Sequence, residues 1–90
     1  MDLNKIRKQI DNIDTQLLEL FLDRMELSKG VAAYKKENNM PIFQGDREKQ
    51  ILDRISSVSP EEHRGGARLL FTNIMDIGKT LQSEQLNDTS

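Results

Sequence analysis

Cysteine is absent from this chain of 90 residues, histidine occurs once and aromatic side chains are few. The lack of cysteine excludes disulfide bonds, thiolate metal sites and a thiolate nucleophile. A lone histidine, His63, cannot form the imidazole cluster that many metal sites use. Three Phe, one Tyr and no Trp offer little for stacking on single-stranded bases. We therefore expect no bound metal ion.

Long apolar runs and an excess of basic residues are also missing. No run approaches the roughly 20 residues of a membrane span, and the polar segment from Met1 to Arg7 does not look like a signal peptide. The net charge is −2, from 13 basic and 15 acidic residues, whereas nucleic-acid binding needs a basic excess on one face. These properties predict a single cytoplasmic domain, residues 1–90, that binds neither membranes nor nucleic acid.

The chain does have a long stripe of apolar residues at helical spacing. Steps of three and four residues alternate through Leu3, Ile6, Ile10, Ile13, Leu17, Leu20, Arg24, Leu27, Val31 and Tyr34. This heptad pattern predicts one helix over about residues 3–37. Asp2 is a candidate N-cap, and Asn38 and Asn39 followed by Pro41 predict the end of the helix.

The length of this helix bears on the oligomeric state. The helix would be about 50 Å long, whereas a compact domain of this size is only about 30 Å across. It therefore extends beyond its own domain, and a second copy of the chain is the simplest partner for the excess. We expect an all-α homodimer with antiparallel long helices. A long monomeric hairpin with a frayed end is the alternative.

Two shorter helices are predicted in the rest of the chain. The first spans about residues 46–56, with Asp46 as its N-cap. The second spans about residues 60–84, because Ser59 at the N-cap followed by Pro60 is a typical helix start. The residues expected to point inward are Ile51, Leu52, Ile55, Leu70, Ile74, Ile77 and Leu81.

Two features modify this third helix. Gly65-Gly66 lies near its start and should loosen or kink the first turns. Residues 85–90 are polar, so we expect them to fray.

Arg24 occupies a position of the stripe where Ile or Leu would be expected. A buried guanidinium needs a negatively charged partner. An internal ion pair, a polar residue that sets the helix register or an anionic ligand are the three interpretations. Lys35 lies three turns further on nearly the same face, about 16 Å along the axis. The two cations are placed to clasp a ligand with Val31 as an apolar wall, although Lys35 alone would be a solvated charge near a helix C-terminus.

Arg7 lies roughly 25 Å from Arg24 along the same helix, too far to reach the same small ligand. In an antiparallel pair with its dyad near Leu18, however, Arg7 of one chain lies opposite Lys29 and Gly30 of the other. The geometry thus predicts a site shared between two chains. The alternative is a surface pair between Arg7 and Asp11, one turn along.

Other candidate site residues give weaker signals. Arg47 and Glu48 fall in the first turn of the second helix, where charged residues are common. Gly78 and Gln82 are four residues apart on the third helix, and Gln82 either donates to a ligand or is solvated.

Together these residues resemble the all-helical chorismate mutases of the AroQ class. The matching features are Arg7, the run Ile10-Asp11-x-Ile13-Asp14, Arg24, Lys35, Pro41-Ile42, Asp46-Arg47-Glu48 and Gln82. The resemblance implies three helices per chain, intertwined into a homodimer with two equivalent sites. It also implies isomerisation of chorismate to prephenate, on the route to phenylalanine and tyrosine, without a cofactor.

The resemblance further implies roles for these residues. Arg24 and Arg7 of the other chain would hold the two substrate carboxylates. Lys35 and Gln82 would donate to the ether oxygen. Glu48 would bind the ring hydroxyl, with support from Arg47.

Two positions depart from the family pattern. Gln44 stands where many members have an Asp that contacts the substrate hydroxyl. Gly78 stands where some have a Ser that contacts a carboxylate. Either change would lower affinity or be compensated by backbone groups and water.

Two other functions compete with the mutase. An isochorismate pyruvate-lyase has the same fold and a similar dianionic substrate, and it would release pyruvate. A non-catalytic dimerisation module would use Arg24 only to set the register.

Overall fold

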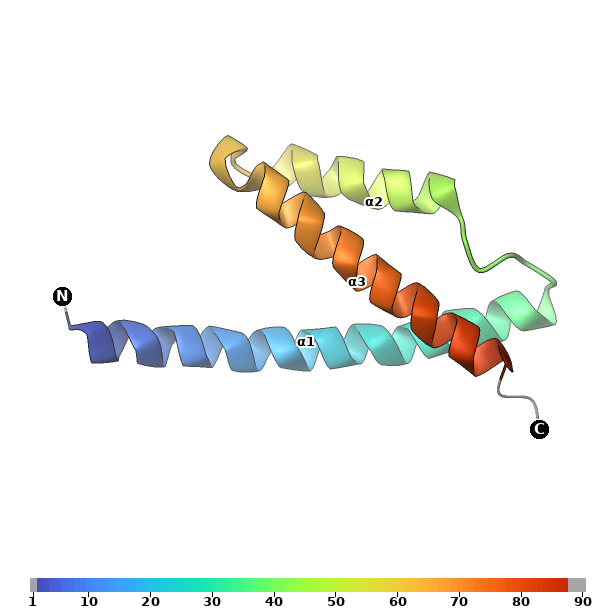
Figure 1. The fold of residues 1–90 in the computed structure, drawn as a ribbon, viewed down its shortest axis with the longest axis horizontal. Helices are drawn as coiled ribbons and strands as arrows, with labels where there is room; N and C mark the ends of the chain where they lie inside the picture. The colour runs from blue at the N-terminus through green and yellow to red at the C-terminus, as the bar shows by residue number, and fades with distance from the viewer. Residues whose placement is uncertain (1, 88–90) are drawn as a thin grey trace.

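The computed structural model describes residues 2–87, which form three α-helices (Figure 1). Helix α1 spans Leu3–Glu37, α2 spans Gly45–Val58 and α3 spans Glu61–Asn87. This described part contains no strand, so the prediction of an all-α chain with three helices is confirmed. None of these helices is both long enough and apolar enough to cross a membrane.

Polar side chains cap both ends of α1. At the start, the Asp2 Oδ1 atom accepts a hydrogen bond from the Asn4 amide at 2.9 Å. At the end, the Asn38 side chain donates to the Tyr34 carbonyl at 2.8 Å. Asn39 then adopts a φ of 53°, a left-handed conformation that Asn tolerates better than most residues. Helix α1 therefore ends at these asparagines, and the loop to α2 follows.

Both shorter helices begin within one residue of the predicted start. Helix α2 starts one residue before Asp46, with Gln44 at the N-cap, so Asp46 lies in the first turn. Its carboxylate there still faces the positive end of the helix dipole. Helix α3 starts at Glu61. Ser59 does not cap it as predicted but donates its hydroxyl to the Ile55 carbonyl at 2.6 Å, at the end of α2.

Two arginines of α3 explain why α2 continues to Val58, beyond its predicted end at residue 56. Arg68 Nη1 donates to the Leu52 carbonyl at 3.3 Å and to Ser56 Oγ at 2.6 Å. Arg64 Nε donates to the Ser56 carbonyl at 3.1 Å. The Ser56 carbonyl is one of the last four of α2, which lack an intrahelical donor, and the other two bonds tie α3 to the last turns of α2.

Helix α3 ends three residues later than predicted. It continues to Asn87 rather than stopping at residue 84, because Glu84 and Gln85 are good helix formers and no Gly or Pro follows them. The helix also passes through Gly65 and Gly66 without a break. Residues 88–90 of the predicted tail lie outside the described residues.

The single chain is flat and elongated. It measures 55 × 30 × 14 Å, with a radius of gyration of 16.5 Å, compared with about 12 Å for a compact chain of this length. Helix α3 packs on the C-terminal half of α1, and α2 folds back along α3 (Figure 1). The start of α1 extends beyond the other two helices, and α3 diverges from the N-terminal half of α1 (Figure 1).

The predicted face of α3 is only partly buried within the chain: Ile74 and Leu81 are half-buried. Leu70 and Ile77, expected to point inward, are 51% and 47% exposed. Met75 and Gly78 are buried instead, and Gly78 lies against Ser28 of α1. Helix α3 thus has apolar residues on more than one face, and the periodicity alone did not identify which of them are buried within the chain.

The predicted stripe on α1 is not covered by the chain itself. Ile10, Ile13 and Leu17 are 49–55% exposed, and Leu3 at the start of the helix is also exposed. Burying such side chains stabilises a fold by about 25 cal/mol per Å² of apolar surface. This stripe is therefore an apolar surface without a partner in the described part of the chain.

The cap on α1 gives a test of this description. We expect Asp2→Ala to lower the free energy of unfolding by about 1 kcal/mol, because one amide at the helix start loses its acceptor. Asp2→Asn should have little effect, since Asn caps equally well. Urea denaturation followed by circular dichroism measures both changes. Equal stability of the Ala and Asn variants would contradict a role for the cap.

Candidate active site

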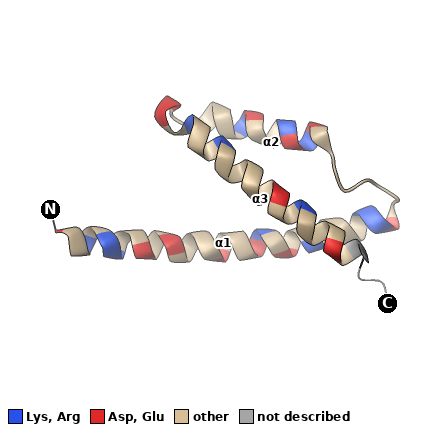
Figure 2. Cartoon of the chain, viewed as in Figure 1, with Lys and Arg blue, Asp and Glu red and all other residues tan. Residues whose placement is uncertain are grey.

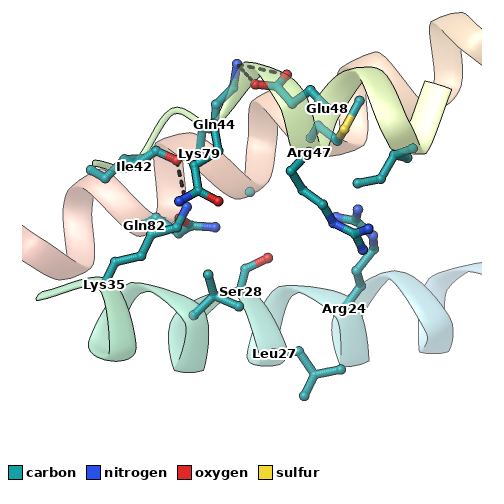
Figure 3. Close-up of a pocket in the computed structure, with 14 residues that line it drawn as sticks. Arg24, Leu27, Ser28, Lys35, Ile42, Gln44, Arg47, Glu48, Lys79 and Gln82 are labelled. Carbon is teal, nitrogen blue, oxygen red and sulfur yellow. Dashed lines mark hydrogen bonds and ion pairs between the residues drawn. The ribbon is translucent and has the colours of Figure 1, made fainter. Parts of the chain in front are cut away.

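A cavity of about 430 Å³ lies where the three helices and the loop before α2 meet (Figure 3). Its polar and charged lining residues are Arg24, Ser28, Lys35, Gln44, Arg47, Glu48, Lys79 and Gln82. Its other lining residues are Leu27, Val31, Ile42, Ile51, Met75 and Gly78. All of the predicted site residues except Arg7 are therefore brought together. Arg7 is exposed near the start of α1, away from this cavity.

Helical spacing gathers the lining side chains of each helix on one wall of the cavity. On α1, Arg24, Val31 and Lys35 follow one another at seven and four residues, so they share a face. On α3, Gly78 and Gln82 are one turn apart. The wall from α2 comes from its first two turns, which face α1 across the cavity (Figure 3).

Lys35 is the most deeply placed cation of the cavity, with 8% of its surface exposed. Its Nζ atom donates to the Ile42 carbonyl at 2.7 Å and to Gln82 Oε1 at 3.1 Å. Burial lowers the pKa of the Lys35 ammonium, and the nearby charge of Glu48 partly opposes this shift. Both hydrogen-bond partners are neutral, so they orient the ammonium without cancelling its charge.

The bond to Lys35 also orients Gln82. Because the amide oxygen accepts from Lys35, the amide NH2 group of Gln82 is left to donate elsewhere. Gln82 is 8% exposed and lines the cavity. The pair therefore presents two donors, one charged and one neutral, at the same end of the cavity.

Arg24 and Arg47 lie at the other end, and Figure 3 shows their guanidinium groups turned toward one another. Among the described residues, no acidic side chain forms an ion pair with Arg24. This argues against the internal ion pair that the sequence left open. Arg47 Nη1 donates to Gln50 Oε1 at 2.7 Å. Two facing guanidinium groups repel each other unless an anion lies between them.

Glu48 supplies the carboxylate of the cavity, and Lys79 holds it in place. Both Glu48 oxygens lie 3.3 Å from Lys79 Nζ. Lys79 also contacts Asp76 Oδ1 at 3.3 Å and lies 5.0 Å from the centre of the Phe43 ring. Burial disfavours the charge of Lys79, but the hydrogen bonds and charges of Asp76 and Glu48 outweigh it and raise its pKa.

Three contributions to the cavity were not anticipated from the sequence. Lys79 follows Gly78 and could have been suspected from its place one turn before Gln82. Ser28 lies one turn after Arg24 on the same face of α1 and gave the same kind of signal. The Ile42 carbonyl gave none, because a backbone contact depends on the path of the loop.

The positive charge of the cavity is local. Figure 2 shows basic and acidic residues intermixed along the helices rather than gathered by sign. The cavity wall nevertheless combines the cations Arg24, Lys35, Arg47 and Lys79 with the single carboxylate Glu48. Such a site favours a compact anion with more than one negative charge. It offers donors at both ends but no thiol or imidazole for nucleophilic attack.

Comparison with known proteins gives consistent results. The family model described as chorismate mutase type II matches residues 6–83. A chorismate mutase of Methanocaldococcus jannaschii is 37% identical over 90 residues, covering 97% of this chain and 90% of that protein. A bifunctional chorismate mutase/prephenate dehydratase of Aquifex aeolicus is 34% identical over 64 residues, which is 71% of this chain but only 18% of that longer protein.

A solved structure agrees with these sequences. The crystal structure of chorismate mutase from Helicobacter pylori in complex with prephenate superimposes with a TM-score of 0.86. The two chains are 28% identical, and the match covers 98% of this chain and 97% of that one. The resemblance seen in the sequence is confirmed over nearly the whole chain, which belongs to the type II chorismate mutase family.

Proposed function

We propose that this protein catalyses the rearrangement of chorismate to prephenate. The observation that carries the proposal is the cavity between α1, α2 and α3, in which Lys35 and Gln82 present donors opposite Arg24 and Arg47. Chorismate is a dianion with two carboxylates and an ether oxygen, and this set of groups matches the donors. The similarity of this chain to a curated chorismate mutase and to a chorismate mutase solved with prephenate supports the same substrate.

The reaction breaks a C–O bond and forms a C–C bond within one molecule. It needs no nucleophile and no cofactor. An enzyme accelerates such a step by holding the substrate in a folded shape in which the reacting carbons are close together. Donors fixed near the ether oxygen also stabilise the negative charge that grows there as the C–O bond lengthens.

Each residue then has a specific role in the proposed mechanism. Arg24 binds a substrate carboxylate, and Lys35 and Gln82 donate to the ether oxygen. Lys35 is already held by Ile42 and Gln82, so little reorganisation is needed when the substrate enters. Glu48, held by Lys79, accepts a hydrogen bond from the ring hydroxyl.

The two departures from the family pattern bear on this binding mode. Gln44 lines the cavity and keeps a side-chain oxygen that can accept from the ring hydroxyl without carrying the charge of Asp. Arg47 lies opposite Arg24 and supports the hydroxyl end of the site. Gly78 brings no side chain of its own to the carboxylates.

We further propose that two chains form an intertwined antiparallel dimer in which Arg7 enters the site of the partner. The exposed stripe on the N-terminal half of α1 supports this, because it has no cover within the described chain. Leu27 and Val31 line the cavity, yet they are 71% and 44% exposed. The α1 wall of the cavity is therefore partly exposed, and in the proposed dimer Arg7 of the partner would enter from this wall. The cytoplasmic location stays a prediction.

Replacing Lys35 tests the chemistry. We expect Lys35→Ala to reduce kcat by about 100- to 1000-fold, because one donor to the developing charge is lost. Lys36→Ala is the matched control, since Lys36 is an exposed lysine of the same helical turn, and it should keep nearly full activity. The assay follows chorismate by ultraviolet absorbance and identifies the product. Near-normal turnover by Lys35→Ala would exclude this mechanism, and pyruvate formed from isochorismate would indicate the lyase.

The lowered pKa of Lys35 predicts how activity depends on pH. The ammonium donates only while it is protonated, so kcat/KM should fall as the pH rises through the pKa of Lys35 in the free enzyme. Because burial lowers that pKa, the fall should begin at lower pH than for an ordinary lysine. A bound dianion favours the charged form, so the fall in kcat should come at higher pH. The measurement is the profile of kcat and of kcat/KM from neutral to alkaline pH. If the two constants fell at the same pH, that result would argue against this role.

Mixing two inactive variants tests the shared site. Arg7→Ala and Lys35→Ala should each be nearly inactive as homodimers. A mixed dimer would contain one site with Lys35 from one chain and Arg7 from the other, both intact. After joint refolding of equal amounts, we expect about a quarter of wild-type activity, because half of the dimers are mixed and each has one intact site. If Arg7 served its own chain, mixing would restore nothing.

A further inference from the structure

Helices α1 and α3 come unusually close at Ser28 and Gly78. A Cβ atom built on Gly78 would lie only 3.2 Å from Ser28 Oγ. Gly78 sits inside a regular helix, and no glycine of the described chain has a positive φ. The backbone therefore does not require glycine here. Glycine even destabilises a helix interior relative to alanine. What glycine provides at this position is space for the Ser28 hydroxyl.

The hydroxyl of Ser28 is free to bind something else. Helical Ser and Thr side chains often donate to the carbonyl four residues earlier, and Thr15, Thr72 and Thr80 do so here. Ser28 forms no such bond, and its hydroxyl has no hydrogen-bond partner among the described residues. The residue is 8% exposed. It lines the cavity, and Figure 3 shows its oxygen directed into it.

The position of this hydroxyl indicates what it would contact. Ser28 lies about 6 Å beyond Arg24 and about 10 Å before Lys35 along the axis of α1. A ligand that spans the cavity between these two cations must pass over it. The amide of Gly78 cannot serve in its place, because an amide inside a helix donates to the preceding turn.

We propose that Ser28 is a substrate-binding residue whose hydroxyl donates a hydrogen bond to a carboxylate oxygen of the bound dianion, and that Gly78 is a positioning residue that makes room for it. This inference rests on the proposed mutase function and adds a residue to its site. In this proposal, Ser28 on α1 supplies the hydroxyl that Gly78 on α3 does not have. The competing role for Ser28 is a small side chain that only lets two helices pack closely.

Ser28→Ala separates the two roles, because it removes only the hydroxyl oxygen and keeps a small, helix-forming residue. We expect kcat/KM for chorismate to fall about 10- to 100-fold, as for the loss of a hydrogen bond to a charged group. The change should appear mainly in KM and in weaker inhibition by prephenate, since carboxylates are bound in substrate, transition state and product alike. Ser57→Ala, an exposed serine at the end of α2, is the control.

Moving the hydroxyl is a sharper test. Gly78→Ala should raise KM, because the added Cβ would lie 3.2 Å from Ser28 Oγ and would shift that oxygen by a few tenths of an ångström, while the helix keeps a good helix former at this position. Gly65→Ala on the same helix meets nothing within 4 Å and should leave KM unchanged. The double variant Ser28→Ala/Gly78→Ser returns a hydroxyl to the same space from α3. It should recover most of the affinity lost in Ser28→Ala.

The outcomes distinguish this inference from the proposed function. An active wild-type enzyme with an unchanged KM in both Ser28→Ala and Gly78→Ala would overturn the role of Ser28 and leave the mutase assignment intact. A raised KM in Gly78→Ala with an unchanged KM in Ser28→Ala would show a packing role and would also overturn it. A folded wild-type protein that neither converts chorismate nor binds prephenate would overturn the proposed function itself.

Discussion

The length of α1 is the constraint on which the rest of the structure depends. A helix of 35 residues cannot be covered by the rest of the described chain, because only α3 packs on it, along its C-terminal half, and α2 packs on α3. The molecule is consequently thin, with few buried apolar side chains, among them Met25, Ala32, Ile51 and Met75. The same arrangement leaves the α1 wall of the cavity partly exposed. In the proposed dimer, a single event covers the apolar stripe and completes the site.

The arrangement of charge in the cavity follows a second physical rule. Lys35 is held by a carbonyl and an amide oxygen, and Arg24 has no acidic partner among the described residues. Glu48 is the carboxylate in the lining, and it forms an ion pair with Lys79. The cations at the two ends are thus positioned without being neutralised, which is costly in the empty site and favourable once an anion enters. The proposed rearrangement needs a folded substrate and donors that stabilise charge, and these cations can supply both.

The sequence predicted these features to different degrees. The heptad stripe and the asparagines at Asn38 and Asn39 identified α1, because both signals are local. The cations Arg24 and Lys35 were recognisable because they interrupt or follow that stripe at helical spacing. The inward face of α3 was predicted only in part, since Ile74 and Leu81 are half-buried whereas Leu70 and Ile77 are exposed. The closeness of Ser28 to Gly78 was not predictable, because it depends on how two helices cross.

The shared site is tested most directly by sedimentation velocity of the purified chain over a dilution series, with and without prephenate. A ligand bound by residues from both chains must strengthen their association, by the same factor by which association strengthens its binding. We expect a dimer whose dissociation constant falls as prephenate is added, and this dependence should disappear in Arg7→Ala. A chain that is active as a monomer, or a dimer whose dissociation is indifferent to prephenate, would contradict a site built from two chains.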